Sequence, residues 1–311
     1  MSLISLKKGV GKVDELKIVD AHHHFWDLSQ NYYPWLCDEP LIPFRYGDYS
    51  AIRKSFMPKD YFQAAGEHQV VMTVTMEGEW DPKDPTGESV WIQSVAETYG
   101  FPHAHVAQAW LDGDNIDEVL QAQAKIELVK SVRHKPHTAA SAEQIIIGTP
   151  GSMGDSKWRE GYGLLEDYGL HFDLQAPWWH LYEAAELAGD YPNILMILNH
   201  TGLPADRSDS GLLGWRNAMS TLAELPNVVV KVSGLGLPGK TWSVVDNESI
   251  IRSAIEIFGI DRCMFASNFP VDGLVADLHS LISGYKEVLA HFPLDDQKKF
   301  FHDNAVKVYG L

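Results

Sequence analysis

The chain has 311 residues, of which 45% are hydrophobic, so it is long enough and apolar enough to bury a large core. Its 42 acidic residues outnumber the 25 basic ones, and the formal net charge is -17. A surface of this sign repels nucleic-acid phosphates and anionic lipid head groups, so we expect neither a nucleic-acid partner nor a membrane partner.

The chain contains two cysteines, Cys37 and Cys263, and no Cys-x-x-Cys pair. A disulfide framework would need more cysteines, so this usage fits a reducing compartment. Residues 1–12 hold three lysines and two glycines without the apolar run of a signal peptide. The longest apolar run, residues 194–198, is too short to cross a bilayer. We therefore expect a soluble cytoplasmic protein.

The first expected element is a short strand that runs directly into three consecutive histidines. Side chains alternate between the two faces of an extended strand. His22 and His24 are therefore expected on one face together with Asp20, and His23 on the other face together with Ala21. Two imidazoles on one face can hold a single metal ion or an anionic substrate. The alternative is a purification tag or a loop that is merely rich in histidine.

Residues 26–58 form a long irregular segment that is rich in Tyr, Trp, Phe and Pro. Disordered loops are poor in aromatic residues. We therefore expect this segment to pack as a lid over the mouth of a barrel, with a simple hydrophobic cap over one barrel end as the alternative.

The rest of the chain alternates short apolar strands with helical patterns. Strands are expected at residues 70–76, 103–111, 128–134, 170–174, 193–199, 227–233 and 262–266, and helices at residues 88–99, 115–125, 157–167, 178–188, 212–225, 248–258, 276–289 and 295–309. Asp114 is the expected N-cap of the second of these helices. Apolar strands that alternate with helices imply a parallel sheet buried on both faces. Eight such units predict an α/β fold, a (β/α)8 TIM barrel, as one domain over residues 1–311.

In such a barrel the reacting groups lie at the carboxyl ends of the strands. The functional candidates expected there are His22, His24, Glu77, Trp110, Arg133, Gln175, His200, Lys231 and Asn268. His200 could bind a metal ion or donate a proton to a substrate oxygen, and its alternative is a structural histidine in a loop. Arg133 is expected either to clamp a carboxylate or carbonyl or to form a buried ion pair. Lys231 lies among valines, so it belongs to the site or is paired with an acid such as Glu77.

Eight segments of the chain resemble the motifs of a known superfamily. They are residues 18–27 (IVDAHHHFWD), 33–36 (YPWL), 131–134 (SVRH), 171–174 (HFDL), 198–204 (LNHTGLP), 230–235 (VKVSGL), 265–272 (FASNFPVD) and 304–311 (NAVKVYGL). In this order they resemble the amidohydrolase superfamily. Within it, the chain is similar to the branch of TIM-barrel metal-dependent hydrolases that includes sugar-acid lactonases and pyrone-dicarboxylate lactonase.

The resemblance implies a hydrolase of a carboxylic ester, in particular a lactonase that opens a sugar-acid or dicarboxylic lactone by attack of water. It makes His22 and His24 the metal ligands of the first strand and His200 the histidine of the sixth. It implies one divalent metal ion, with zinc as the expected ion, although the branch also contains metal-independent enzymes. Asn268 stands where the family has an aspartate that binds metal and accepts a proton; an amide cannot act as a general base and is a weak neutral ligand. Asp272 either supplies that carboxylate or caps the following helix.

The resulting hypothesis has two groups of residues around an anionic or polyhydroxy lactone. The catalytic residues are His200, Arg133, Asp272 and Asn268, and the substrate-binding residues are Glu77, Lys231, Trp110 and Gln175. A decarboxylase of an aromatic or unsaturated acid on the same scaffold is the first alternative. A barrel that binds a small acid and has lost catalysis is the second. A homo-oligomer is compatible with each of these three functions.

Overall fold

The computed structural model describes residues 16–311, so the expectation for residues 1–12 lies outside the described part. Eight parallel strands pair with their neighbours in the order of the sequence. They are β1 (Ile18–His23), β2 (Val70–Met76), β3 (Ala104–Gln108), β4 (Val129–Arg133), β5 (His171–Leu174), β6 (Met196–Leu198), β7 (Val228–Val232) and β8 (Cys263–Phe265). The residues after β8 return to β1, where the backbone N–H of Asn268 donates to the carbonyl oxygen of His22 over 2.7 Å. The predicted (β/α)8 barrel is confirmed.

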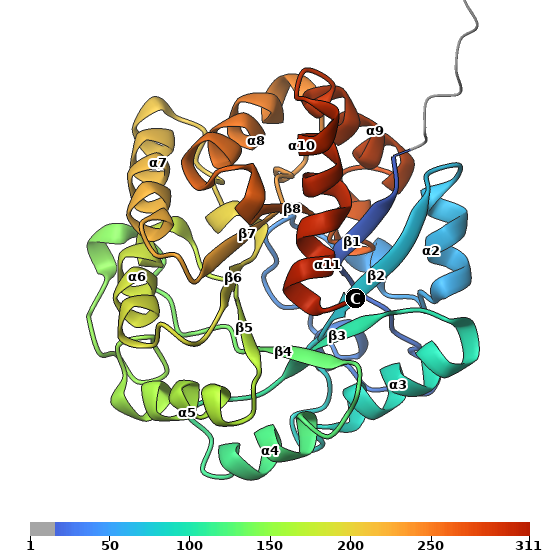
Figure 1. Cartoon of the computed structure of the whole chain (residues 1–311). Helices are drawn as coiled ribbons and strands as arrows, with labels where there is room; N and C mark the ends of the chain where they lie inside the picture. Colours follow the sequence, from blue (N-terminus) through green and yellow to red (C-terminus); the bar gives the residue numbers. More distant parts are fainter. Residues whose placement is uncertain (1–15) are drawn as a thin grey trace, which may run out of the picture.

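One helix follows each strand, and these helices form the outer layer of the barrel (Figure 1). They are α2 (Pro58–Ala65), α3 (Gly87–Tyr99), α4 (Ile116–Gln123), α5 (Ser156–Asp167), α6 (Leu181–Asp190), α7 (Asp209–Ala223), α8 (Val244–Phe258) and α9 (Leu278–Leu289). Several begin where a side chain accepts a hydrogen bond from a free backbone N–H of the first turn, as Asp155, Ser208, Ser243 and Asp277 do. Within residues 16–311, no helix combines the length and the hydropathy that a membrane crossing requires.

The structure corrects several expectations about the helices. Helix α2 lies in a stretch for which we expected no element, and a short helix, α1 (Pro34–Cys37), lies inside the aromatic-rich segment. Asp114 is not the N-cap of α4: Asn115 holds that position, and the carboxylate of Asp114 is paired with Lys157. The expected helix 178–188 begins as a 3-10 turn (Trp178–His180) before α6.

The helix expected at residues 295–309 is broken into α10 (Leu294–Lys298), a π-helical turn (Lys299–Asp303) and α11 (Asn304–Tyr309). Phe300 and Phe301 are consecutive and both fully buried. The Phe301 ring lies 5.5 Å from that of Phe265 in β8, and the Phe300 ring lies 6.3 Å from that of Tyr285 in α9. A π-helical turn widens the helix locally, so both neighbouring rings face the core.

The interior of the barrel is filled in two layers. The lower layer is apolar and includes Val19, Val74, Val106 and Ile197, and Tyr309 of α11 packs into it from the end where the strands begin. Above it lies a polar layer around Asp173 of β5. Its carboxylate accepts hydrogen bonds from Lys231 Nζ (2.6 Å), Ser131 Oγ (2.7 Å), Asn199 Nδ2 (2.7 Å) and the Tyr309 hydroxyl (3.2 Å). The acid that pairs with Lys231 is therefore Asp173 and not Glu77.

Candidate active site

The three consecutive histidines of β1 lie on two sides of the strand. The pairing of β1 with β2 is irregular between Asp20 and His23. Asp20 accepts a hydrogen bond from the Tyr61 hydroxyl of α2 over 2.7 Å, and the ring of His23 lies 4.7 Å from the same tyrosine. His22 and His24 lie together on the inner side, with ring centroids 5.3 Å apart. The expectation that Asp20 shares the face of His22 is wrong, because the irregularity interrupts the strict alternation of side chains.

His200, directly after β6, joins the pair from β1. Its ring centroid lies 4.6 Å from that of His22. The Nδ1 atom of His24 lies 3.0 Å from the carbonyl oxygen of Met76, which can only accept, so Nδ1 carries the hydrogen and Nε2 keeps a free lone pair. The Nδ1 atom of His200 lies 3.0 Å from the Ser233 hydroxyl. Burial above all lowers the pKa of each of these three imidazoles well below its ordinary value, so all three are neutral at pH 7.

The three imidazoles fit a single divalent metal ion in their donor chemistry. Both ring nitrogens of His22 are buried and lack a hydrogen-bond partner, which is costly unless another group satisfies them. A neutral imidazole with a free lone pair is a common zinc ligand, and three of them form a known ligand set. The arrangement differs from the donor chemistry: in residues 16–311 no group of three or more His, Cys, Asp or Glu side chains, these three imidazoles included, is arranged to hold an ion.

Asn268 and Asp272 lie beside these histidines, after β8. Asn268 Nδ2 donates to Asp272 Oδ1 over 2.6 Å, and the Tyr46 hydroxyl donates to the same oxygen over 2.9 Å. Burial raises the pKa of Asp272, and Arg45, at 3.4 Å, opposes this rise. The N-cap of the following helix, α9, is Asp277. Of the two roles considered for Asp272, its carboxylate therefore faces Asn268 and does not cap α9.

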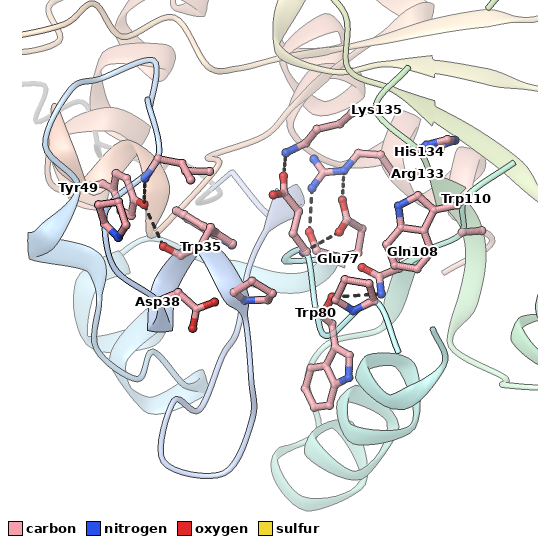
Figure 2. Close-up of a pocket in the computed structure, with 16 residues that line it drawn as sticks. Trp35, Asp38, Tyr49, Glu77, Trp80, Gln108, Trp110, Arg133, His134 and Lys135 are labelled. Carbon is pink, nitrogen blue, oxygen red and sulfur yellow. Dashed lines mark hydrogen bonds and ion pairs between the residues drawn. The ribbon is translucent and has the colours of Figure 1, made fainter. Parts of the chain in front are cut away.

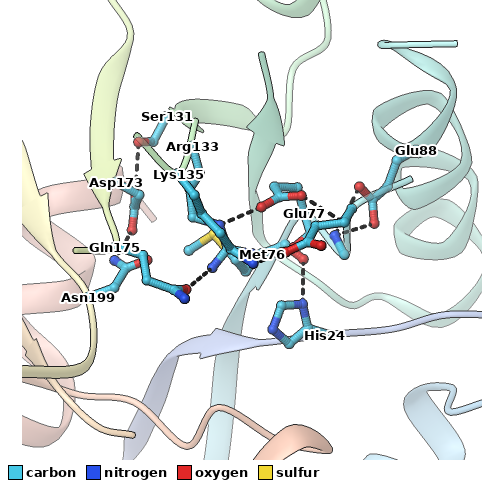
Figure 3. A network of polar contacts seen from close by, with 12 residues as sticks. His24, Met76, Glu77, Glu88, Ser131, Arg133, Lys135, Asp173, Gln175 and Asn199 are labelled. Atoms are coloured by element: carbon cyan, nitrogen blue, oxygen red, sulfur yellow. Dashed lines mark hydrogen bonds and ion pairs between the residues drawn. The ribbon is translucent and has the colours of Figure 1, made fainter. Parts of the chain in front are cut away.

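Arg133, the last residue of β4, is held on two sides (Figure 3). Its Nε donates to Glu77 Oε1 over 2.5 Å and its Nη2 to the Glu77 carbonyl oxygen over 2.8 Å. Its Nη1 donates to Gln175 Oε1 over 3.1 Å. The buried ion pair considered for Arg133 is thus present, and its partner is Glu77. The guanidinium group is fixed at the rim by the residues that follow β2 and β5.

Two adjoining cavities open at this end of the barrel. The smaller cavity, of about 240 Å³, is called the catalytic cavity below because it holds the candidate catalytic residues. His24, Arg133, Gln175, His200 and Asn268 line it from the strand ends, and Trp35, Phe44 and Arg45 line it from the aromatic-rich segment. The second cavity, of about 470 Å³, lies beside it between Trp35 and the residues Trp80 and Trp110 (Figure 2). The segment 26–58 therefore supplies one wall of each cavity.

The predicted site residues lie in three places: the catalytic cavity, the second cavity and the buried region behind the cavity walls. His24, His200, Asn268, Arg133 and Gln175 line the catalytic cavity. Glu77 and Trp110 line the second cavity, which also includes Arg133. The remaining three, His22, Asp272 and Lys231, are almost completely buried behind the walls, and Lys231 belongs to the polar layer around Asp173.

Several residues of the site had no signal in the sequence that we used. Arg45 and Tyr46 hold Asp272 from within the aromatic-rich segment, and Glu79 forms an ion pair with Lys135 at the rim. The cationic residue in an aromatic segment was the available clue for Arg45, because such a side chain needs an acid to pair with when the segment packs down.

The backbone at the mouth is strained. His200, Thr201 and Asn268 have φ angles of 53°, 56° and 56°, a left-handed conformation that side chains other than glycine rarely adopt. A Cβ atom at Gly234 would lie 2.7 Å from the His200 ring, so this glycine allows the imidazole to approach the β7 end. Strain of this kind persists where the surrounding structure holds it, and it often accompanies function.

Comparisons with known proteins agree with this fold. Residues 19–311 match the family model described as amidohydrolase. A Sinorhizobium fredii protein named uncharacterized protein y4mH is 36% identical over 96% of this chain and 100% of its own length. L-fucono-1,5-lactonase from Burkholderia multivorans is 24% identical over 94% of this chain and 96% of its own. The zinc-bound crystal structure of an amidohydrolase from Burkholderia multivorans superposes with a TM-score of 0.75 at 21% identity, covering 94% of this chain and 99% of that one. With its barrel complete and its histidines gathered at the mouth, the chain belongs to the amidohydrolase family of enzymes.

Proposed function

We propose that the protein is a lactonase, which opens a lactone of a sugar acid or a dicarboxylic acid by attack of water. The observation that carries this proposal is the convergence of His24, His200 and Asn268 with Arg133 on one cavity. These groups provide what ester hydrolysis needs, namely donors for a developing oxyanion and acceptors for a water molecule. The similarity to L-fucono-1,5-lactonase supports a lactone as the substrate class.

The carbonyl oxygen of the lactone is assigned to His200. The Ser233 hydroxyl can donate to Nδ1 of His200, which leaves an N–H on Nε2 to point at a substrate oxygen. As water adds to the carbonyl carbon, negative charge grows on that oxygen, and a donor fixed in advance stabilises it. Arg133 and Gln175, which are bonded to each other, hold a hydroxyl or carboxylate of the substrate.

The attacking water is assigned to Asn268 and Asp272. Because Nδ2 of Asn268 is committed to Asp272, its Oδ1 is the amide atom left to accept a hydrogen bond from water. Asp272 takes the proton, directly or through one intervening water, and its raised pKa makes it a stronger base than an exposed carboxylate. The acyl carbon–oxygen bond of the ring then breaks, and the proton passes to the departing ring oxygen.

A divalent ion, when bound, would be held by His22, His24 and His200; Nδ1 of His200 would then donate to the Ser233 hydroxyl, and the ion would polarise the substrate carbonyl as a Lewis acid in place of the Nε2 N–H. Zinc is the proposed ion, and the zinc-bound relative supports this choice. The roles given to Asn268, Asp272 and Arg133 are the same in a metal-independent reaction.

A panel of sugar-acid and dicarboxylic lactones tests the proposal, with acid release followed in a pH-stat with and without added zinc. We expect opening of at least one lactone, and a loss of roughly 100-fold or more in kcat for His200→Ala. His279→Ala, which changes an exposed histidine next to His68, is the matched control and should keep full activity. Failure to open any lactone, together with release of carbon dioxide from an aromatic acid, would replace this proposal with the decarboxylase alternative.

A further inference from the structure

We propose that the substrate carries an uncharged, planar, apolar group, such as an aryl ring, which binds in the second cavity. This cavity, called the aromatic annex below, has a volume of about 470 Å³ and is lined in part by Trp35, Tyr49, Trp80, Gln108 and Trp110. The inference rests on the proposed lactonase function for the other end of the substrate. The proposed substrate therefore carries a substituent that a simple sugar-acid lactone lacks.

The annex adjoins the catalytic cavity, and Trp35, Arg133 and Lys135 line both. It is the larger of the two, at about 470 Å³ against about 240 Å³. A cavity of about 150 Å³ already accommodates benzene, so the annex has room for one or two rings. A lactone held at His24 and His200 can therefore extend a ring past Arg133 into the annex.

Two of the three tryptophans that line the annex, Trp35 and Trp80, are held in place by other rings. Trp35 stacks on Phe44, with centroids 5.6 Å apart and planes 12° from parallel. Trp80 stacks on Trp91, with centroids 6.3 Å apart, and meets the edge of Tyr33 at 5.3 Å. Rings fixed in this way lose little entropy when a flat group packs on them, so they form a prepared stacking surface.

The charged groups around the annex are already paired. Arg133 is bound to Glu77, and Lys135 is bound to Glu79 (Figure 2). Asp38 accepts a hydrogen bond from the Tyr32 hydroxyl over 2.6 Å. A charged substituent would have to compete with these partners, so the annex favours a neutral group.

Two of its neutral polar side chains, Tyr49 and His134, are engaged as well. The Tyr49 hydroxyl donates to the Trp35 carbonyl oxygen over 2.9 Å. The Nδ1 atom of His134 accepts from the backbone N–H of Leu111 at 3.0 Å and from Trp158 Nε1 at 2.9 Å. A sugar ring would bring several hydroxyls and find few free partners, whereas an aryl ring needs none. Both an apolar ring and a glycosyl group can stack on tryptophan, but the shortage of free hydrogen-bond partners favours the apolar ring.

Binding can be tested without any turnover. Isothermal titration would compare three inert cyclic ethers in which a methylene group replaces the lactone carbonyl: tetrahydropyran, phenyl-substituted tetrahydropyran and a glycosyl-substituted tetrahydropyran. We expect the phenyl compound to bind at least about tenfold more tightly than the other two. Trp110→Ala should remove most of this preference and Trp110→Phe should keep it. Trp178→Ala, which changes a half-buried tryptophan outside the annex, should leave it unchanged.

Turnover provides the second measurement. The ratio of kcat/KM for a phenyl-substituted lactone to that of the unsubstituted lactone should be at least about tenfold in the wild type and should approach one in Trp110→Ala. Equal binding of the three ethers, or tighter binding of the glycosyl compound, would overturn the annex proposal even if lactones are opened. Tight binding of the phenyl ether without opening of any lactone would instead overturn the lactonase proposal and leave the annex standing.

Discussion

The side-chain amide of Asn268 donates to the carboxylate of Asp272 over 2.6 Å. The carboxylate beside Asn268 therefore comes from a residue four positions further along the chain. Arg45 and Tyr46 hold the same carboxylate from the aromatic-rich segment. The packing of that segment is thereby linked to the position of the group that we assign as proton acceptor.

Replacing Asp272 by Asn should lower kcat by about 10²- to 10⁴-fold with a small effect on KM, because the change removes a base and leaves the shape of the site. Steady-state kinetics on the best lactone measures this. Asp277→Asn, a change of the α9 cap on the same loop, should cost about 1 kcal/mol of stability or less and leave kcat unaltered. An unchanged kcat in Asp272→Asn would remove Asp272 from the mechanism.

The same carboxylate predicts a pH dependence. A base works only when ionised, so kcat/KM should fall as the pH drops through the pKa of Asp272. Burial raises this pKa above the ordinary value of 3.8, and the acidic limb of the profile should therefore lie at a higher pH than an exposed carboxylate would give. A pH–rate profile of the wild type that stays flat down to pH 4 would contradict the assignment.

Replacing Asn268 by Asp should reduce activity. In the wild type the Asn268 amide nitrogen lies 2.6 Å from Asp272 Oδ1, so the variant places a second carboxylate next to that oxygen. Two carboxylates at this distance cannot both ionise readily, and one pKa rises strongly. We expect a loss of about tenfold or more in kcat/KM near neutral pH. If the wild type is inactive and this variant gains activity, the reading of the protein as a binder that has lost catalysis would be favoured.

Removing the imidazole of His22 should weaken metal binding. After loading with zinc and dialysis, we expect about one ion per chain in the wild type by elemental analysis and far less in His22→Ala, because the His22 ring lies 5.3 Å from that of His24 and 4.6 Å from that of His200 and both its nitrogens lack a partner. His23→Ala is the matched neighbour, since its ring packs on Tyr61, and it should retain zinc. Equal zinc contents in the two variants would exclude the proposed site.

At the scale of single residues, the sequence was informative where chemistry and strand position coincide. His200, Arg133 and Asn268 were placed at the mouth because polar side chains follow apolar strands there. The contacts of Arg45 and the partner of Lys231 were not accessible, since both depend on how segments distant in the sequence pack together. Asp20 was misplaced because a local irregularity of a strand leaves no mark in hydrophobic alternation.

At the scale of elements, strands β5 and β7 are joined inside the barrel by Asp173 and Lys231, both fully buried. Lys231→Met should lower the free energy of unfolding by about 3–5 kcal/mol, because it leaves a buried carboxylate without its cation. Adding Asp173→Asn should recover part of this loss, since the charge is removed and an acceptor remains for Ser131. Urea unfolding of the wild type, both single variants and the double variant measures the coupling energy between Asp173 and Lys231. If the two single losses of unfolding free energy simply add up in the double variant, the proposed coupling is contradicted.

The existence of each strand was predictable from its apolar run, and β2 was placed at its observed bounds. Helix α2 was not predicted because it follows directly on an irregular segment and is short, so its pattern was hidden. The break in the last helix could not be seen either. Its cause is the packing of Phe300 and Phe301 against β8 and α9, which only the tertiary structure reveals.

At the scale of the whole molecule, α11 covers the barrel end opposite the mouth, and the Tyr309 hydroxyl reaches Asp173 in the polar layer. Tyr309→Phe should lower the unfolding free energy by about 1–2 kcal/mol, because it removes one donor to a buried carboxylate. Tyr182→Phe removes an exposed hydroxyl and should have almost no effect. Equal stability losses in the two variants, measured by denaturant unfolding, would mean that the contact with Asp173 contributes nothing.

The left-handed backbone at His200 and Thr201 has a consequence for directed evolution. A β-branched residue in this conformation is unfavourable, and two hydrogen bonds between Thr201 Oγ1 and the Ser233 backbone hold the residue there. Glycine at position 201 would relax the backbone, lose both hydrogen bonds and free the neighbouring imidazole from its fixed orientation. A library varied at this position and selected for turnover should therefore retain threonine, and its glycine variants should open lactones more slowly.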